Sequence, residues 1–208
     1  MEGLQTLENR TIALIVAATI SVGLIYCMLR LYRRRRARAQ LEGAVTVIGL
    51  EHLQNVLIPD GNGGSMHVDF VLLTPRGVLV IDLRDIAGNI FGGDQMTEWT
   101  VMNGAERFTF QNPQNALYDR VAAVRSLVGE VPVEGRILFT RRGNFPKGLP
   151  RWTLMVDSLR TEFPAADRQA FETWLEKFRP AWENLHATAA PSPLNKPQSF
   201  LVELFLRN

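Results

Sequence analysis

The 208-residue sequence predicts an α/β domain, a mixed sheet flanked by helices, behind an N-terminal transmembrane helix. Three observations predict this arrangement. An uncharged apolar run begins at Thr11, the dipeptide Pro75-Arg76 separates two runs rich in β-branched residues, and Asn112-Pro113 opens a segment with helical periodicity. A chain of this length usually forms one domain with appendages.

The apolar run extends from Thr11 to Leu29, with no charge between Arg10 and Arg30. A helix needs roughly 20 residues to cross the hydrocarbon core of a bilayer, and inside lipid every backbone group must be hydrogen-bonded within its own segment. We therefore expect a transmembrane helix at residues 11–30, with the lipid bilayer as its partner and a short outside tail at residues 1–10. A cleaved signal peptide is the alternative, but such peptides carry positive charge before a shorter apolar core.

Arginines follow the apolar run. Residues 30–38 contribute +6 and residues 1–29 contribute −1, which leaves −3 of the total of +2 for the chain from Leu41 onward. Because basic flanks stay in the cytoplasm, we expect residues 31–40 to be a basic juxtamembrane segment. The protein would then be a single-pass protein of the inner (cytoplasmic) membrane with a cytoplasmic C-terminal domain. The net −3 of that domain argues against broad binding of nucleic acid.

Strands are expected where short apolar runs rich in β-branched residues lie between turn residues. These runs are Val45–Ile48, Leu53–Ile58, His67–Thr74, Val78–Leu83, Trp99–Met102, Arg107–Phe110 and Ile137–Thr140. The third and fourth form a hairpin, since Pro75 presets the turn between them. Gly88 to Gly93 is expected to be a further turn region.

Helices are expected in two places. Asn112 is a cap and Pro113 occupies the first helical position of one helix, whose buried face would carry apolar residues from Leu117 to Val128. A second amphipathic helix spans about Ala165–Lys177 and is broken or restarted by Pro180. Residues 151–188 would thus be a helical C-terminal extension, and residues 189–208 a Pro-rich linker with an apolar tail that docks on the domain.

The predicted hairpin places two carboxylates opposite each other. A two-residue turn at Pro75-Arg76 places Thr74 opposite Gly77. Each step back along the first strand is then matched by a step forward along the second, so Asp69 faces Asp82. Arg84 shares their face of the sheet. Two carboxylates among apolar side chains repel each other unless they share a proton or a cation lies between them. That cation is either Mg²⁺, which prefers carboxylate oxygens, or Arg84 itself in a site without metal.

The run from His67 to Asp82, the glycine-rich Gly88–Gly93 and Glu98-Trp99-Thr100 resemble the nuclease-related domain, NERD. The later Asn112-Pro113-Gln114 is similar to the Asn-Pro element of that family, and the resemblance covers roughly residues 41–150. It implies a restriction-endonuclease-like fold, in which two acids hold Mg²⁺ and a lysine orients or activates the attacking water.

The resemblance assigns Asp69 and Asp82 as catalytic metal ligands and puts Arg84 at the position of the family's lysine. Arginine is not deprotonated in proteins, so Arg84 cannot act as a general base. It can hold a phosphate or stabilise charge in a transition state.

A basic stretch without acidic residues runs from Gly135 to Val156 and contains Arg141, Arg142 and Lys147. These residues are candidate phosphate contacts, because such contacts dominate affinity for nucleic acid. A solvated basic loop is the alternative interpretation.

Two functions are consistent with these residues. The first is Mg²⁺-dependent hydrolysis of phosphodiester bonds in nucleic acid by a membrane-anchored enzyme with an altered motif. The second is a non-catalytic, membrane-tethered module that binds nucleic acid or a protein partner. The acid pair favours the first and the arginine in place of lysine favours the second.

Overall fold

The computed structural model describes residues 20–29, 31–32, 41–165, 167 and 172–193. The chain divides into two compact units, Met1–Gly43 and Ala44–Asn208. In the first unit, residues 20–29 are helical and their apolar side chains are exposed. Across the described ranges, no helix is both long enough and apolar enough to span a membrane. Residues 11–19 and 30 of the expected transmembrane helix lie outside those ranges, as do most of residues 31–40.

The second unit is built on a mixed sheet with the strand order β10-β1-β2-β3-β7-β9. Its strands are β1 (Glu51–Pro59), β2 (Ser65–Thr74), β3 (Gly77–Arg84), β7 (Val133–Phe139), β9 (Thr153–Met155) and β10 (Ala190–Pro191). β1 is antiparallel to β2 and β2 is antiparallel to β3, whereas β7 is parallel to β3 and β9 is parallel to β7. The predicted mixed sheet is confirmed.

The central hairpin is buried on both faces, since every residue of β3 is buried and β2 is buried from His67 onward. Pro75 and Arg76 form the turn, and Thr74 pairs with Gly77 as the register predicts. Gly77 has φ +117°, and a Cβ at this position would lie 2.3 Å from the carbonyl oxygen of Pro132, so glycine is required here.

A second, smaller sheet has the order β6-β5-β4-β8 and was not anticipated as a separate sheet. Its strands are β4 (Gly88–Phe91), β5 (Glu98–Asn103), β6 (Glu106–Gln111) and β8 (Gly143–Asn144). The expected strands at Trp99–Met102 and Arg107–Phe110 are confirmed. The expected turn at Gly88–Gly93 is wrong in part, because Gly88–Phe91 pairs with both β5 and β8.

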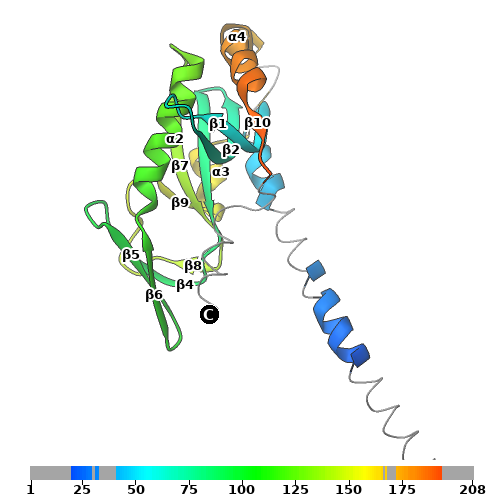
Figure 1. The fold of residues 1–208 in the computed structure, drawn as a ribbon, viewed down its shortest axis with the longest axis vertical. Helices are drawn as coiled ribbons and strands as arrows, with labels where there is room; N and C mark the ends of the chain where they lie inside the picture. The colour runs from blue at the N-terminus through cyan, green and yellow to red at the C-terminus, as the bar shows by residue number, and fades with distance from the viewer. Residues whose placement is uncertain (1–19, 30, 33–40, 166, 168–171, 194–208) are drawn as a thin grey trace, which may run out of the picture. The chain divides into compact units, whose positions relative to one another are not determined.

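Helix α2 (Pro113–Val128) lies along the large sheet (Figure 1) and packs against β7, β3, β2 and β1. The Asn112 side chain caps it by accepting a hydrogen bond from the Gln114 N–H at 2.9 Å, as predicted. Leu117, Val124 and Val128 are buried on its inner face.

Three expectations for the remaining segments are corrected. The expected strand at Val45–Ile48 is wrong, because residues 45 and 46 are helical and residues 47 and 48 form a turn, although Val45 is fully buried. Helix α4 (Glu172–Thr188) continues through Pro180, and burial of Phe178 and Trp182 offsets the hydrogen bond lost at the proline. The expected linker contributes strand β10, which pairs with β1. The expected docking tail, residues 199–206, lies outside the described residues.

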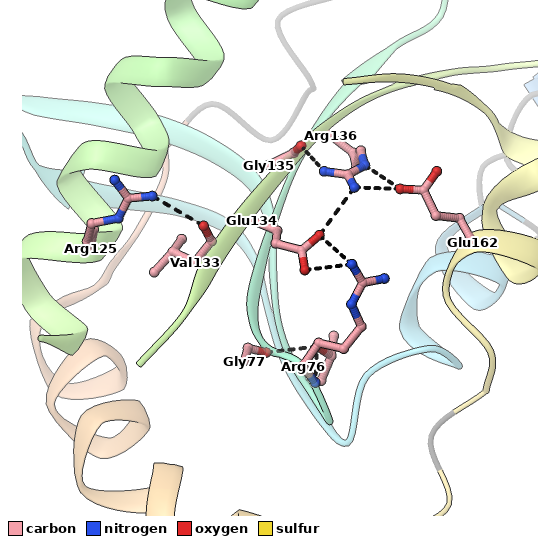
Figure 2. A network of polar contacts seen from close by, with 9 residues as sticks. Arg76, Gly77, Arg125, Val133, Glu134, Gly135, Arg136 and Glu162 are labelled. Atoms are coloured by element: carbon pink, nitrogen blue, oxygen red, sulfur yellow. Dashed lines mark hydrogen bonds and ion pairs between the residues drawn. The ribbon is translucent and has the colours of Figure 1, made fainter. Parts of the chain in front are cut away.

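Ion pairs join the tip of the β2–β3 hairpin to β7 and to the short helix α3 (Leu159–Glu162), as Figure 2 shows. The Arg76 Nη2 atom lies 2.8 Å from Glu134, and Arg136 lies 2.6 Å from Glu162 and 3.2 Å from Glu134. Both guanidinium groups also lie over the Phe163 ring, at 5.0 and 5.3 Å. This network fixes the end of the hairpin opposite to its two aspartates.

Candidate functional site

The two candidate acids lie on neighbouring antiparallel strands, Asp69 on β2 and Asp82 on β3. The observed register runs from Thr74 opposite Gly77 to Phe70 opposite Ile81, which is the predicted one. Asp69 and Asp82 are the next residues along the two strands, and the charge of Asp82 acts on Asp69. Both are buried, with 4% and 1% of their surface exposed.

The β ladder is interrupted at Asp69 on both sides. Pairing between β1 and β2 passes from Gln54 opposite Phe70 to Val56 opposite Val68, and pairing between β2 and β3 ends at Phe70. Asn55, which would face Asp69, has φ +53°. Asparagine is one of the few residues besides glycine that adopt this left-handed conformation readily, and here it accompanies the break in the ladder opposite Asp69.

Asp82 is neutralised by two arginines. Its Oδ2 atom accepts a hydrogen bond from Arg84 Nη2 at 2.7 Å and another from Arg120 Nη1 at 3.4 Å. Arg120 comes from α2 and also donates from Nε to the His67 carbonyl oxygen at 2.7 Å. Both arginines are at least nine-tenths buried, and a buried carboxylate needs such partners to remain ionised.

Asp69 is in a different state. Burial, followed by the charge of Asp82, raises its pKa to about 7, and the hydrogen bond from the Leu83 N–H to Oδ2 at 2.8 Å opposes both. Its Oδ1 atom has no hydrogen-bond partner, and neither has Arg84 Nε. Near neutral pH the acid pair therefore holds a proton on Asp69 for part of the time.

His67 completes the cluster from β2. Its Nδ1 atom lies 3.7 Å from Asp69 Oδ1, and its Nε2 atom lies 3.3 Å from Asn55 Oδ1. Burial lowers the pKa of His67, and the charge of Arg120 lowers it further. His67 is therefore neutral at physiological pH.

The acid pair as arranged does not fit Mg²⁺. A magnesium site uses one or two carboxylates and keeps several waters in an octahedron, but Asp82 Oδ2 already faces two guanidinium groups. A divalent cation beside these two cations would be repelled in a buried setting. Within residues 41–165 and the other described ranges, no group of three or more His, Cys, Asp or Glu side chains is arranged to hold a metal ion.

The candidate phosphate contacts lie outside this cluster, on exposed loops, and acids from elsewhere in the sequence meet two of them. Arg141 pairs with Asp157 at 2.6 Å, and Arg142 pairs with Asp85 at 2.9 Å. Lys147 lies 5.9 Å from the centre of the Phe91 ring. Their role in binding phosphate stays a prediction.

Sequence reasoning missed Arg120, the third charge on the acid pair. It lies 38 residues from Asp82. The sequence feature that could have indicated it is a positively charged residue three positions after Leu117, among the apolar residues of the inner face of α2. A lone arginine at the border of such a face is usually solvated, so this signal is weak.

Comparison with known proteins bears on these residues. The chain is 26% identical over 76 residues to an uncharacterized protein of Bacillus anthracis. The match covers 36% of each chain, so it spans about a third of that relative. No solved structure matches the chain.

A profile of the nuclease-related domain matches residues 34–140, about half of the chain. This range contains β1 to β6, α2 and β7, and with them all the members of the buried cluster. The chain therefore belongs to the NERD family of nuclease-related domains.

Proposed function

We propose that this protein is a membrane-anchored NERD protein that binds nucleic acid without hydrolysing it. The observation that carries the proposal is the double ion pair on Asp82, whose Oδ2 atom is held by Arg84 and Arg120. The acid that would hold a metal ion is thereby already neutralised by protein cations.

The proposal includes a kinship with restriction-endonuclease-like nucleases. It is supported by the family match and by two acids on adjacent antiparallel strands. In such nucleases a lysine stands two positions after the second acid. Here a guanidinium stands there, which stays protonated and is fixed by its ion pair, so it supplies no base.

Anchoring is proposed through residues 11–30. It is supported by the long apolar run and the six arginines after it. The helix at residues 20–29 adds support, because large apolar side chains such as Val22 and Met28 are 67% and 72% exposed and need a nonpolar environment. The NERD domain would then face the cytoplasm from the inner membrane.

The proposal is tested with the full chain purified in detergent. Fluorescence anisotropy would measure binding of labelled single-stranded DNA, duplex DNA and RNA, and gels would measure cleavage of the same substrates. We expect binding to be equal in EDTA and in Mg²⁺ at constant ionic strength, and we expect no cleavage with Mg²⁺ or Mn²⁺. Cleavage by the wild type would overturn the non-hydrolytic proposal, and lack of binding to all three ligands would overturn the binding proposal.

Mg²⁺-dependent hydrolysis is the second candidate function. It is favoured by the buried Oδ1 atom of Asp69, a carboxylate oxygen without a hydrogen-bond partner. If this candidate is correct, Arg84→Lys will raise cleavage, since it puts a compact, titratable ammonium beside the acids, and Asp82→Asn will abolish it. Arg76→Lys on the same hairpin is the matched control, because Arg76 pairs with Glu134 at the opposite end. If wild type and Arg84→Lys are both inert, the second candidate fails.

A further inference from the structure

We propose that Tyr118, Arg151 and Trp152 form a stacking surface for an unpaired base of single-stranded nucleic acid. The inference rests on the proposed binding of nucleic acid and names the form that is bound. The surface does not include the acid pair.

The aromatic rings lie together although they come from distant segments. Tyr118 on α2 and Trp152 before β9 have ring centroids 4.7 Å apart at an angle of 76°. The Arg151 guanidinium lies over the Trp152 ring at 4.8 Å. Tyr118 is 52% exposed and Arg151 is exposed, whereas Trp152 is partly buried and packs against the core. Trp152 is thus the base of the surface, and Tyr118 presents its ring to solvent.

The backbone that carries Arg151 and Trp152 is held in a strained conformation. Trp152 has φ +56°, which is rare for a bulky residue. Hydrogen bonds fasten both sides of it: Arg151 N–H donates to Asp94 Oδ1 at 2.9 Å, and the Ile137 N–H donates to the Trp152 carbonyl at 2.7 Å. Strain of this kind persists only where the surroundings impose it, and it is concentrated at ligand sites.

Gln114 connects this loop to the helix that carries Tyr118. Its side-chain amide donates to Asp94 Oδ1 at 2.8 Å and to the Arg151 carbonyl at 2.9 Å. The hydrogen bond from Gln114 is the largest cause of a lowered pKa at Asp94, so this carboxylate stays ionised and keeps holding the loop. The surface is therefore pre-organised before a ligand arrives.

The chemistry of the surface suits an unpaired base with its phosphate. Every nucleobase presents a π face to an aromatic ring, and an adjacent guanidinium takes the phosphate oxygens. In a duplex these faces are covered by neighbouring base pairs, so single strands are the matching form.

The surface is separate from the acid cluster. At about 100° per residue, Tyr118 and Arg120 leave α2 in directions about 160° apart. Arg120 reaches the His67 carbonyl on β2, whereas Tyr118 reaches the loop before β9. A ligand on Tyr118 would thus leave Asp82 in its ion pairs.

The experiment compares two ligands of equal charge, a labelled 20-nucleotide oligothymidylate and the same backbone with abasic sites throughout. We expect the full-length wild type in detergent to bind the first at least tenfold more tightly. Tyr118→Ala should remove most of this preference, with a loss of about 5- to 100-fold in affinity for the oligothymidylate, and Tyr118→Phe should retain it. Arg151→Gln should weaken binding of both ligands, whereas Arg160→Gln, an exposed control on α3, should change neither.

The outcomes separate the two proposals. If the wild type binds both ligands equally, or Tyr118→Ala keeps the preference, the stacking surface is overturned while binding through phosphates stands. If the wild type binds neither ligand nor any other nucleic acid, the proposed function fails. Because Tyr118 is half exposed, its variants should fold, and an unchanged melting temperature verifies this.

Discussion

At the residue scale, a cluster of charged and titratable side chains is buried between the hairpin and α2. Its members are His67, Asp69, Asp82, Arg84 and Arg120. The charges of Asp82 and Arg84 act on the pKa of Asp69, and those of Arg120 and Asp82 act on the pKa of His67. Asp82 pairs with both arginines, and burial and the charge of Asp82 raise the pKa of Asp69 by disfavouring its ionisation. Removing one partner of such a buried pair leaves an uncompensated charge, which typically costs about 3–5 kcal/mol.

Asp69→Asn is expected to stabilise the protein at pH 8. The pKa of Asp69 is raised to about 7 in the folded state from 3.8. As the pH rises, the unfolded chain therefore loses this proton at a lower pH than the folded chain does. The wild type therefore loses stability as the pH rises from about 4 to about 7. Asparagine does not titrate, and it can still accept the Leu83 N–H bond. The difference in free energy of unfolding between Asp69→Asn and the wild type should grow over this range, reach on the order of 1–3 kcal/mol, and stay constant above pH 7.

Urea unfolding of both chains between pH 5 and pH 8, followed by tryptophan fluorescence, measures this difference. The contribution of His67 is present in both chains, so it does not enter the comparison to first order. Asp119→Asn, an exposed acid on α2, is the matched control. A difference between wild type and Asp69→Asn that is independent of pH would show that Asp69 is ionised throughout.

At the scale of elements, the site depends on how closely α2 lies on β7. Gly135 on β7 faces the helix, and a Cβ at this position would lie 2.6 Å from Val121 Cγ2 and 3.1 Å from Leu117. The missing side chain lets α2 approach the sheet. This approach brings Arg120 to Asp82 on one side of α2 and Tyr118 to Trp152 on the other.

Gly135→Ala should destabilise the fold by about 1–3 kcal/mol, because the added methyl group pushes α2 away from the sheet. Chemical denaturation measures this loss. Gly93→Ala is the control, since its Cβ would make ordinary contacts with Met96 at 3.5 and 3.6 Å. Equal stability of the two variants would mean that α2 tolerates the displacement.

At the scale of the whole molecule, the charges are divided along the chain. Residues 30–38 carry +6, whereas the NERD-containing part from Leu41 onward carries −3. In the proposed membrane-anchored protein, the positive segment would be attracted to anionic headgroups. The net negative domain favours selective over general contact with nucleic acid, which agrees with a local site such as that around Tyr118.

Reporter fusions at Asn208 should be active in the cytoplasmic form, because six arginines follow the apolar run and one precedes it. Removing residues 1–40 should move the chain from the membrane fraction to the soluble fraction, as measured by fractionation and immunoblotting. A reporter that is active outside the cytoplasm would contradict the proposed orientation and any role on intracellular nucleic acid.

The sequence by itself determined the features that depend on neighbouring residues. A two-residue turn at Pro75-Arg76 and the alternation of side chains along a strand fix the register that brings Asp69 toward Asp82. Asn112-Pro113 fixes the start of α2 through a cap and a preset φ angle. The motifs around the hairpin were sufficient to indicate the NERD family. These features rest on turn geometry and on hydrogen bonds within a few residues.

The tertiary structure decided which charges meet. Arg120 reaches Asp82, and Arg141 and Arg142 meet Asp157 and Asp85, because helix and loop packing brings distant segments together. Packing between distant segments also accounts for the second sheet and for the continuation of helix α4 beyond Pro180. An electrostatic interaction depends on distance and burial in space, which no local pattern encodes. The hairpin could therefore be predicted from its residues, but the pairing of its acids with two arginines could not.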